Sequence, residues 1–132
     1  VFDLIIAHEF GHAVQGRTGI LGGERWLAES ASSKQEKAEL SRRSEVQADC
    51  FAGAALNSLS SSLQLTETDR SDIMRVMFEI GDDQLAERHN VNPDRVDAHG
   101  SGQNRRMWAE RGLKAKSVED CNTFTAPSSE VE

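Results

Sequence analysis

His8 and His12 stand four residues apart in the stretch HEFGH, and Glu9 directly follows the first of them. Side chains four residues apart lie one above the other on an α-helix, so both imidazoles can reach a single zinc ion. Glu9 lies about 100° further around the same helix. A carboxylate there contacts a water beside the ion rather than the ion itself, which is the position of a general base. The stretch therefore predicts two metal ligands and a catalytic base.

The residues around this stretch favour a metal site. LIIA precedes His8 and AV follows His12, so both histidines lie on an apolar helix that would be buried, where neutral imidazoles need partners. Gly11 between them allows another element to approach closely. Because HExxH is a short motif, the alternative is an ordinary amphipathic helix whose two histidines meet other groups.

A third protein ligand has to come from another element, and a carboxylate on a second helix is one established solution for catalytic zinc. One helical stripe carries carboxylates among apolar residues: Glu45, Asp49, Ala52 and Leu56. Buried carboxylates need a partner, which makes Glu45 the candidate third ligand. Asp49, one turn further on, is placed to accept the far ring N–H of a ligand histidine and to fix its tautomer.

An alternative for this stripe is a solvated helix face, on which Glu45 pairs with Arg42 or Arg43. Several small residues weigh against it, because they indicate close helix packing: Ala48, Ala52, Ala54 and Ala55. Both interpretations stay open at the level of sequence.

Composition and charge limit the class of protein. The chain has 132 residues, 37% hydrophobic and 28% charged, which suits one soluble domain with a modest core. The formal charge of -7 and the pI near 5.1 disfavour nucleic acid or an anionic membrane as the main partner. No apolar run approaches the length of a membrane-spanning helix. Because the chain begins at Val1 inside an apolar run, we expect a processed protein or a fragment of a longer one.

Two cysteines, Cys50 and Cys121, stand far apart and outside any CxxC pattern, which disfavours a cysteine zinc site. They form either one long-range disulfide or two buried free thiols. The sequence leaves both alternatives open, because it does not set the redox compartment.

The helical patterns predict a mainly α fold with little strand signal. The first helix, VFDLIIAHEFGHAVQ, should end at Gly16 or Gly19. The glycine-rich TGILGGERW that follows is predicted to be a loop, with Trp26 covering nearby apolar surface. Residues 33–59 should form one long helix, or two with a break, and the second half should be buried.

A third helix is expected after TETD, where Thr66 or Thr68 can cap its first turn. Its apolar stripe should face the core: Ile73, Val76, Met77 and Ile80. Residues 81–100 are predicted to be a weak helix end and a loop, with Pro93 and Gly100 as breaks.

The last predicted helix is NRRMWAER, capped by Ser101 and stopped by Gly112. Within it, Arg105 and Trp108 are expected to fix packing. The tail, residues 125–132, has too little apolar content to pack and is predicted to be disordered.

Several motifs follow one another in a specific order: LIIAHEFGHAVQ, SEVQADCFAG, IGDD, HG, RxxW with RG after it, and CNTF. In this set the chain resembles the bacterial neutral zinc metallopeptidases. The resemblance implies a zincin-like helical core at residues 1–124, with His8, His12 and Glu45 as zinc ligands. It also implies Glu9 as base and Asp49 as support for a ligand. Any β-sheet, and a membrane anchor common in the family, would lie upstream of this chain.

We therefore expect a zinc-dependent peptidase acting on peptide or protein substrates, extracytoplasmic or membrane-anchored in its full-length form rather than cytoplasmic. The chain has no tyrosine to stabilise an oxyanion, which leaves His99, His89 or an arginine as candidate donors, and His99 in the HG segment is favoured. Alternatively His99 caps or packs the loop, and His89 is expected to be a cation near a helix C-terminus. The competing functions are a non-catalytic zinc-binding helical module and a metal-free helical scaffold.

Overall fold

The computed structural model describes residues 2–92 and 98–132, and within these ranges the chain is helical and forms no strand. This confirms the predicted mainly α class. The longer elements are α1 (Phe2–Thr18), α2 (Ile20–Ser30), α3 (Lys34–Ser58), α5 (Glu67–Glu79), α6 (Asp82–His89) and α7 (Gly102–Lys114). The shorter ones are α4 (Ser60–Leu63), η2 (Val118–Cys121), η3 (Thr123–Thr125) and η4 (Ser128–Glu130). Pro93, which was predicted to interrupt helical structure in residues 81–100, lies outside the described residues.

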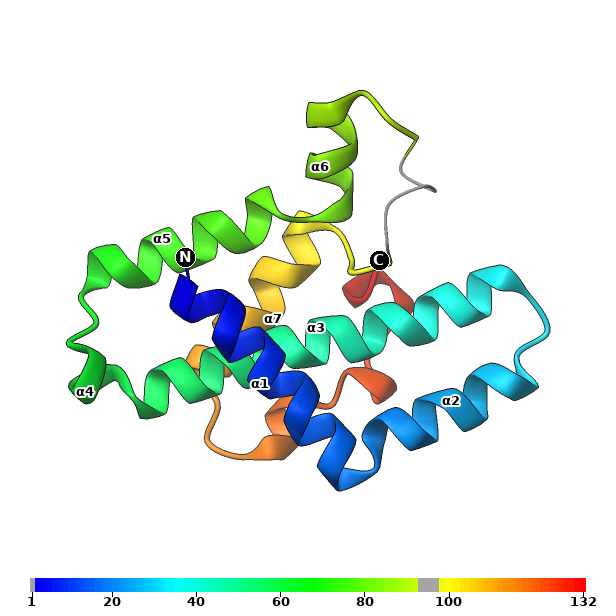
Figure 1. Cartoon of the computed structure of the whole chain (residues 1–132), viewed down its shortest axis with the longest axis horizontal. Helices are drawn as coiled ribbons and strands as arrows, with labels where there is room; N and C mark the ends of the chain where they lie inside the picture. The colour runs from blue at the N-terminus through cyan, green and yellow to red at the C-terminus, as the bar shows by residue number, and fades with distance from the viewer. Residues whose placement is uncertain (1, 93–97) are drawn as a thin grey trace.

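Helix α3 is the centre of the fold, with α1 crossing it and α7 packed along it, and α5 lies against α7 (Figure 1). One apolar cluster joins these four helices: Leu4, Ala7, Ala52, Leu56, Met77, Ala109 and Leu113. A second lies between α3, α7 and the C-terminal segment: Val46, Cys50, Trp108, Cys121 and Val131. Burial of the second half of α3 between these clusters confirms the sequence prediction for that helix.

Side-chain caps begin three of the helices. Ser33 accepts a hydrogen bond from the Glu36 backbone N–H at the start of α3. Thr66 forms a capping box with Asp69 at the start of α5. Ser101 begins α7 as predicted. These local bonds explain why helix starts are readable from the sequence.

The stretch TGILGGERW was predicted to be a loop, and this was wrong, because α2 covers most of it. Only Gly19 takes up the left-handed conformation, with φ of 86°, and it alone turns the chain between α1 and α2. The glycines that suggested a loop, Gly22 and Gly23, lie inside the helix. Trp26, which was expected to cover apolar surface, is 68% exposed.

Residues 81–100 contain a separate helix, α6, rather than only a weak helix end. Gly81 precedes it, and two acidic residues in its first turn, Asp82 and Asp83, suit the positive end of the helix dipole. His89 lies in its last turn, in the place expected of a cation near a helix C-terminus.

The predicted disorder of residues 125–132 is corrected by the structure, in which this tail packs on α3 and α7. Val131 is fully buried. The Trp108 indole N–H donates to the Glu130 carbonyl over 2.7 Å, and Arg42 Nε donates to the Val131 carbonyl over 2.9 Å. Composition missed this packing because partners elsewhere in the chain satisfy the polar backbone of the tail.

Cys50 and Cys121 form a disulfide, with their Cα atoms 5.6 Å apart, which decides between the two alternatives left by the sequence. The bond ties α3 to η2 across 71 residues of chain. A crosslink over a loop of this length restricts the unfolded chain and stabilises the fold by about 4 kcal/mol.

Gly112 was expected to stop α7, but the helix continues to Lys114. Gly112 is needed for contact instead, because a Cβ there would lie 1.9 Å from the Cys50 carbonyl oxygen. Its missing side chain lets the backbones of α7 and α3 touch.

We expect Gly112→Ala to lower the free energy of unfolding by at least about 1 to 3 kcal/mol, the range typical of overpacking, since α7 and α3 would have to separate. Urea unfolding measures this. The matched control is Gly22→Ala on α2, where an added Cβ meets no atom within 4 Å and helix propensity favours alanine by about 1 kcal/mol. Equal effects of the two substitutions would contradict the packing argument.

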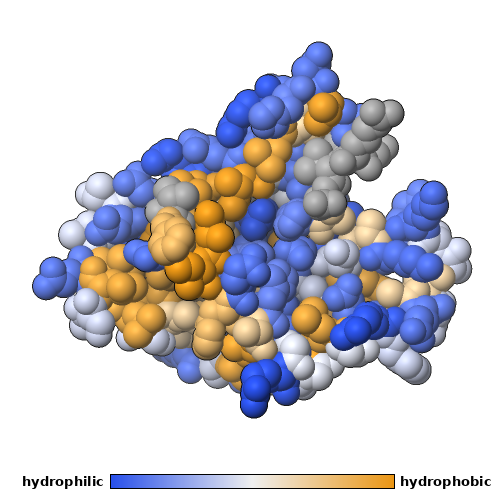
Figure 2. Space-filling model, viewed as in Figure 1, coloured by the Kyte–Doolittle hydropathy of each residue, from blue (hydrophilic) through white to orange (hydrophobic). Residues whose placement is uncertain are grey.

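An apolar patch is exposed where the N-terminal half of α1 lies beside α4 and the end of α3 (Figure 2). Its exposed members are Phe2, Ile5, Ile6, Phe10, Leu59 and Leu63. Within the described parts of the chain, no helix has both the length and the apolar character needed to cross a membrane.

Candidate metal centre

Two histidines from α1 and one glutamate from α3 converge at the crossing of these helices. The Nε2 atoms of His8 and His12 lie 3.0 Å apart. Glu45 Oε2 lies 3.3 Å from the first of these nitrogens and 3.4 Å from the second. One donor atom from each residue therefore fits within a region 4.8 Å across.

Gly11 is the reason the two helices meet so closely. A Cβ at this position would lie 2.8 Å from the carbonyl oxygen of Ala48. Gly11 stands between the two histidines, and Ala48 stands between Glu45 and Asp49. The contact of small residues thus brings the two histidines against the two carboxylates.

The surroundings of Glu45 fit a cation. Its Oε2 atom is buried and has no hydrogen-bond partner among the described residues, although the imidazole nitrogens of His8 and His12 lie 3.3 and 3.4 Å away. A buried carboxylate oxygen without a partner is costly, and a metal ion shared with two imidazoles would satisfy it. Two nitrogens and one carboxylate oxygen form the ligand set of a catalytic zinc site that keeps one position open.

Arg42 and Arg43, the alternative partners of Glu45, are engaged elsewhere. Arg42 Nε donates to the Val131 carbonyl. Arg43 pairs with Glu39 over 2.6 Å and donates to the carbonyls of Thr123 and Ala126. Both arginines therefore hold the C-terminal segment and leave Glu45 facing the histidines.

Asp49 orients the ring of His8. Its Oδ1 lies 2.7 Å from His8 Nδ1, and because a carboxylate only accepts, the proton lies on Nδ1. The other nitrogen, Nε2, then presents its lone pair to the cluster. Asp49 is fully buried and held from α7 by Arg105, whose Nε and Nη2 donate over 2.9 and 3.0 Å.

Sequence reasoning expected Arg105 to fix packing and did not find its contact with Asp49. Arg105 also donates to the Ile80 carbonyl, so one guanidinium connects α3, α5 and α7 behind the cluster. Its position in the RxxW motif was the signal available, but the partner of a buried arginine depends on tertiary structure. Trp108 is buried and fixes packing, as expected.

Gln15 was also missed, although it supports the second histidine. Its Oε1 lies 2.8 Å from His12 Nδ1, and its side chain is fully buried. Its place on the His12 face of α1, three residues on, was the only sequence signal for it.

The electrostatics of the metal-free site follow from these contacts. Burial lowers the pKa of His8, but hydrogen bonding to Asp49 and contact with Glu45 outweigh it and raise that pKa to about 9. For His12, contact with Glu45 is the main cause of a raised pKa. Burial raises the pKa of Glu45, yet His12 and His8 overcome it and hold the pKa well below its usual range. Without metal, the site therefore holds protons in the place of a cation.

A pH dependence of stability follows for the metal-free chain. The pKa of His8 is higher in the folded state than its ordinary value of 6.5, so its contribution to stability is complete below pH 6.5 and is lost as the pH rises to about 9. The urea midpoint of the chelated protein should fall across this window. The variant His8→Gln should show a smaller fall, because only the raised pKa of His12 then remains, whereas His89→Gln, an exposed control, should keep the full fall. A fall of the same size in His8→Gln would assign the effect to another group.

The remaining predicted site residues are Glu9 on α1 and His99 in the segment before α7. Glu9 is exposed on α1 and forms no hydrogen bond or ion pair with another described residue. His99 Nε2 lies 3.9 Å from Glu45 Oε2, so the structure brings this histidine beside the cluster. Its Nδ1 lies 3.6 Å from Asp82 Oδ1, and its backbone N–H donates to Asp82 Oδ2 over 2.7 Å. The sequence indicated Asp82 only as part of the IGDD motif, without a role, and the structure shows that it holds the segment of His99 from α6.

Comparison with known proteins identifies relatives of this chain. Residues 1–124 match the family described as "Putative neutral zinc metallopeptidase". The uncharacterized protein YpfJ of Escherichia coli (strain K12) is 38% identical over 122 residues, which cover 91% of this chain and 42% of YpfJ. The uncharacterized protein Rv2575 of Mycobacterium tuberculosis (strain H37Rv) is 29% identical over 136 residues, or 94% of this chain and 44% of Rv2575. The chain thus spans less than half the length of these curated relatives. No solved structure matches it.

Proposed function

The chain belongs to the neutral zinc metallopeptidase family, and from that premise we propose that it hydrolyses peptide bonds with zinc held by His8, His12 and Glu45. The observation that carries the proposal is the buried, unpartnered Glu45 Oε2 facing two imidazole nitrogens. This arrangement uses three protein ligands, as catalytic zinc sites do, whereas structural sites close the fourth position with a protein ligand.

Glu9 is the proposed general base. Zinc in this position would supply Lewis acidity, which acidifies a water and polarises a carbonyl. Glu9 follows His8 on α1 and is exposed, so its carboxylate is available to take the proton of the attacking water. The same carboxylate then carries the proton to the leaving amine.

His99 is the proposed donor to the oxyanion. Its Nε2 faces the cluster, and Asp82 holds its backbone through the N–H groups of His99 and Gly100. The second oxygen of Asp82, Oδ1, is buried on the Nδ1 side of the ring, where it favours a proton on that nitrogen and an aligned ring, so His99 donates from Nε2 as the doubly protonated imidazolium. A donor fixed beforehand in this way stabilises developing charge without reorganisation.

The alternative function is a non-catalytic zinc-binding helical module that serves folding or partner binding. Glu9, which is exposed and directly follows His8 on α1, favours the enzyme, because a purely structural site has no use for a base there. The third candidate, a metal-free helical scaffold, would leave protonated His8 and His12, at 3.3 and 3.4 Å, to balance the charge of Glu45.

We place the full-length protein outside the cytoplasm or on a membrane anchor. The Cys50–Cys121 disulfide supports this proposal, because such bonds persist in oxidising compartments. The proposed partner is a peptide or protein substrate, and the formal charge of -7 disfavours nucleic acid.

Elemental analysis of the purified full-length protein, together with casein cleavage before and after chelation, tests the function. We expect stoichiometric zinc, loss of cleavage on chelation, and recovery when zinc is returned. Absence of stoichiometric zinc would favour the metal-free scaffold. Zinc without cleavage of casein or a peptide library would favour the non-catalytic module.

A further inference from the structure

The imidazole of His12 is oriented by a side chain whose own direction is fixed. The amide nitrogen of Gln15 donates to the Ser44 carbonyl over 2.8 Å, and since a carbonyl only accepts, this contact identifies the amide nitrogen. The amide oxygen of Gln15 must therefore be the atom 2.8 Å from His12 Nδ1. The proton of His12 then lies on Nδ1, and Nε2 is the atom that faces Glu45 and His8.

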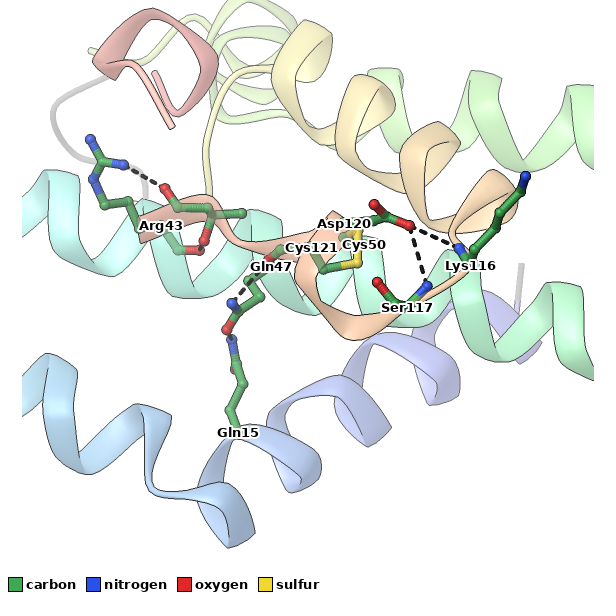
Figure 3. The surroundings of a disulfide bond; sticks show 9 residues. Gln15, Arg43, Gln47, Cys50, Lys116, Ser117, Asp120 and Cys121 are labelled. Carbon is green, nitrogen blue, oxygen red and sulfur yellow. Dashed lines mark hydrogen bonds between the residues drawn. A yellow bond between two sulfur atoms is a disulfide. The ribbon is translucent and has the colours of Figure 1, made fainter. Parts of the chain in front are cut away.

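Gln15 is in turn held by Gln47 on α3. Gln15 Nε2 donates to Gln47 Oε1 over 2.9 Å, and Gln47 Nε2 donates to the Cys121 carbonyl over 3.0 Å. Figure 3 shows Gln15 reaching from α1 to Gln47, which lies beside the Cys50–Cys121 disulfide. Both glutamines are buried, so breaking one of these hydrogen bonds costs free energy, because water cannot freely take the place of the lost partner.

The Cys121 carbonyl, which accepts the hydrogen bond from Gln47, belongs to a segment that the disulfide attaches to α3. Cys50 follows Asp49 within α3. It is held in place because Gly112 of α7 packs closely against its carbonyl, where an added Cβ would lie 1.9 Å from the oxygen. The η2 turn ending at Cys121 is braced internally, because Asp120 accepts hydrogen bonds from the backbone N–H groups of Lys116 and Ser117 (Figure 3). If the sulfur–sulfur bond were broken, Cys121 rather than Cys50 would move.

We infer that Gln15 and Gln47 are positioning residues for His12, and that through them the Cys50–Cys121 disulfide tunes the affinity of the site for a divalent metal ion. The inference rests on the proposed zinc site. Reduction by a dithiol breaks the S–S bond, transfers two electrons and two protons, and leaves two thiols while the dithiol closes to a disulfide. The two sulfurs then separate to non-bonded contact, which draws the Cys121 carbonyl away from Gln47.

The expected effect is graded. Thr123, two residues beyond Cys121, stays attached to α3 because its hydroxyl donates to the Arg43 carbonyl and Arg43 donates back to it. Removing the disulfide should therefore weaken zinc binding by about threefold to tenfold, below the 10 to 100-fold typical when a direct support of a ligand is removed. Gln15→Met, which removes that direct support, should fall in the larger range.

A comparison of zinc affinity in four proteins tests the coupling. These are the disulfide-bonded wild type, the Cys50→Ser/Cys121→Ser variant, and each of the two with Gln47→Met added. The serine variant avoids reductants that bind zinc, and competition with a chromophoric chelator measures affinity. We expect loss of the disulfide to weaken binding only when Gln47 is present. The Co²⁺ absorption spectrum should change in parallel, since it reports ligand geometry. Gln35→Met, an exposed site on the same helix, is the matched control.

Equal zinc affinity with and without the disulfide would overturn the inference, as would an equal loss in the Gln47→Met background. If the serine variant does not fold, unaltered affinity and Co²⁺ spectrum in disulfide-bonded Gln47→Met would overturn it. In metal-free protein, the side-chain amide NMR signals of Gln15 and Gln47 should shift when the disulfide is removed, and unchanged signals would refute the coupling. Zinc binding without peptide cleavage would refute the proposed function alone.

Discussion

Replacing Glu9 by glutamine is expected to reduce peptide cleavage by about a hundredfold to ten-thousandfold while zinc stays bound. Glutamine keeps the size of the side chain but cannot accept the proton of the attacking water. Glu9 is exposed and contributes no ligand atom to the cluster of His8, His12 and Glu45, so neither the fold nor the metal should be lost.

The measurement is the rate of casein or peptide cleavage alongside the zinc content of each preparation. Glu29→Gln, an exposed glutamate on α2, is the matched control and should cleave at the wild-type rate. Equal activity of Glu9→Gln and the wild type would contradict the role of Glu9 as general base. Loss of zinc from Glu9→Gln would instead assign this residue to the metal.

Glu45→Ala should abolish stoichiometric zinc binding, because it removes the carboxylate that, among the described residues, faces both histidines. The variant should still fold, since the unpartnered oxygen contributes no hydrogen bond within the described residues. Zinc content after dialysis and affinity by chelator competition measure the effect. Glu67→Ala, at the exposed start of α5, is the control. Undiminished affinity in Glu45→Ala would show that the third ligand is another residue.

The substitution Asp49→Ala tests whether Asp49 orients a zinc ligand or is itself a ligand. Zinc affinity should fall by about 10 to 100-fold, the range for residues that orient a ligand. The substitution also leaves Arg105 buried without its carboxylate, so we expect the free energy of unfolding to fall by about 3 to 5 kcal/mol. Asp49→Asn keeps the volume and one acceptor, and it should retain more stability than Asp49→Ala. A loss of zinc as complete as in Glu45→Ala would contradict the supporting role.

The candidate site was more accessible to sequence reasoning than most of its surroundings. His8, Glu9 and His12 are neighbours on one helix, so helical geometry alone places them. Glu45 and Asp49 could be chosen because two carboxylates recur on an apolar stripe of α3. The supports of these residues were not accessible in this way. Arg105 lies 56 residues from Asp49 along the chain, and Gln47 meets Cys121 across 74 residues.

By itself, the sequence determined the features that depend on neighbouring residues: the mainly α class, a cap at Thr66 or Thr68, the cap at Ser101, and the spacing of the two histidines. Only the tertiary structure decided whether Gly112 ends a helix or lets two helices touch, and whether the polar tail packs. It also decided that the cysteines are joined. The physical reason is that periodicity and capping act within a few residues, whereas close backbone contact, buried ion pairs and crosslinks join residues far apart in the chain.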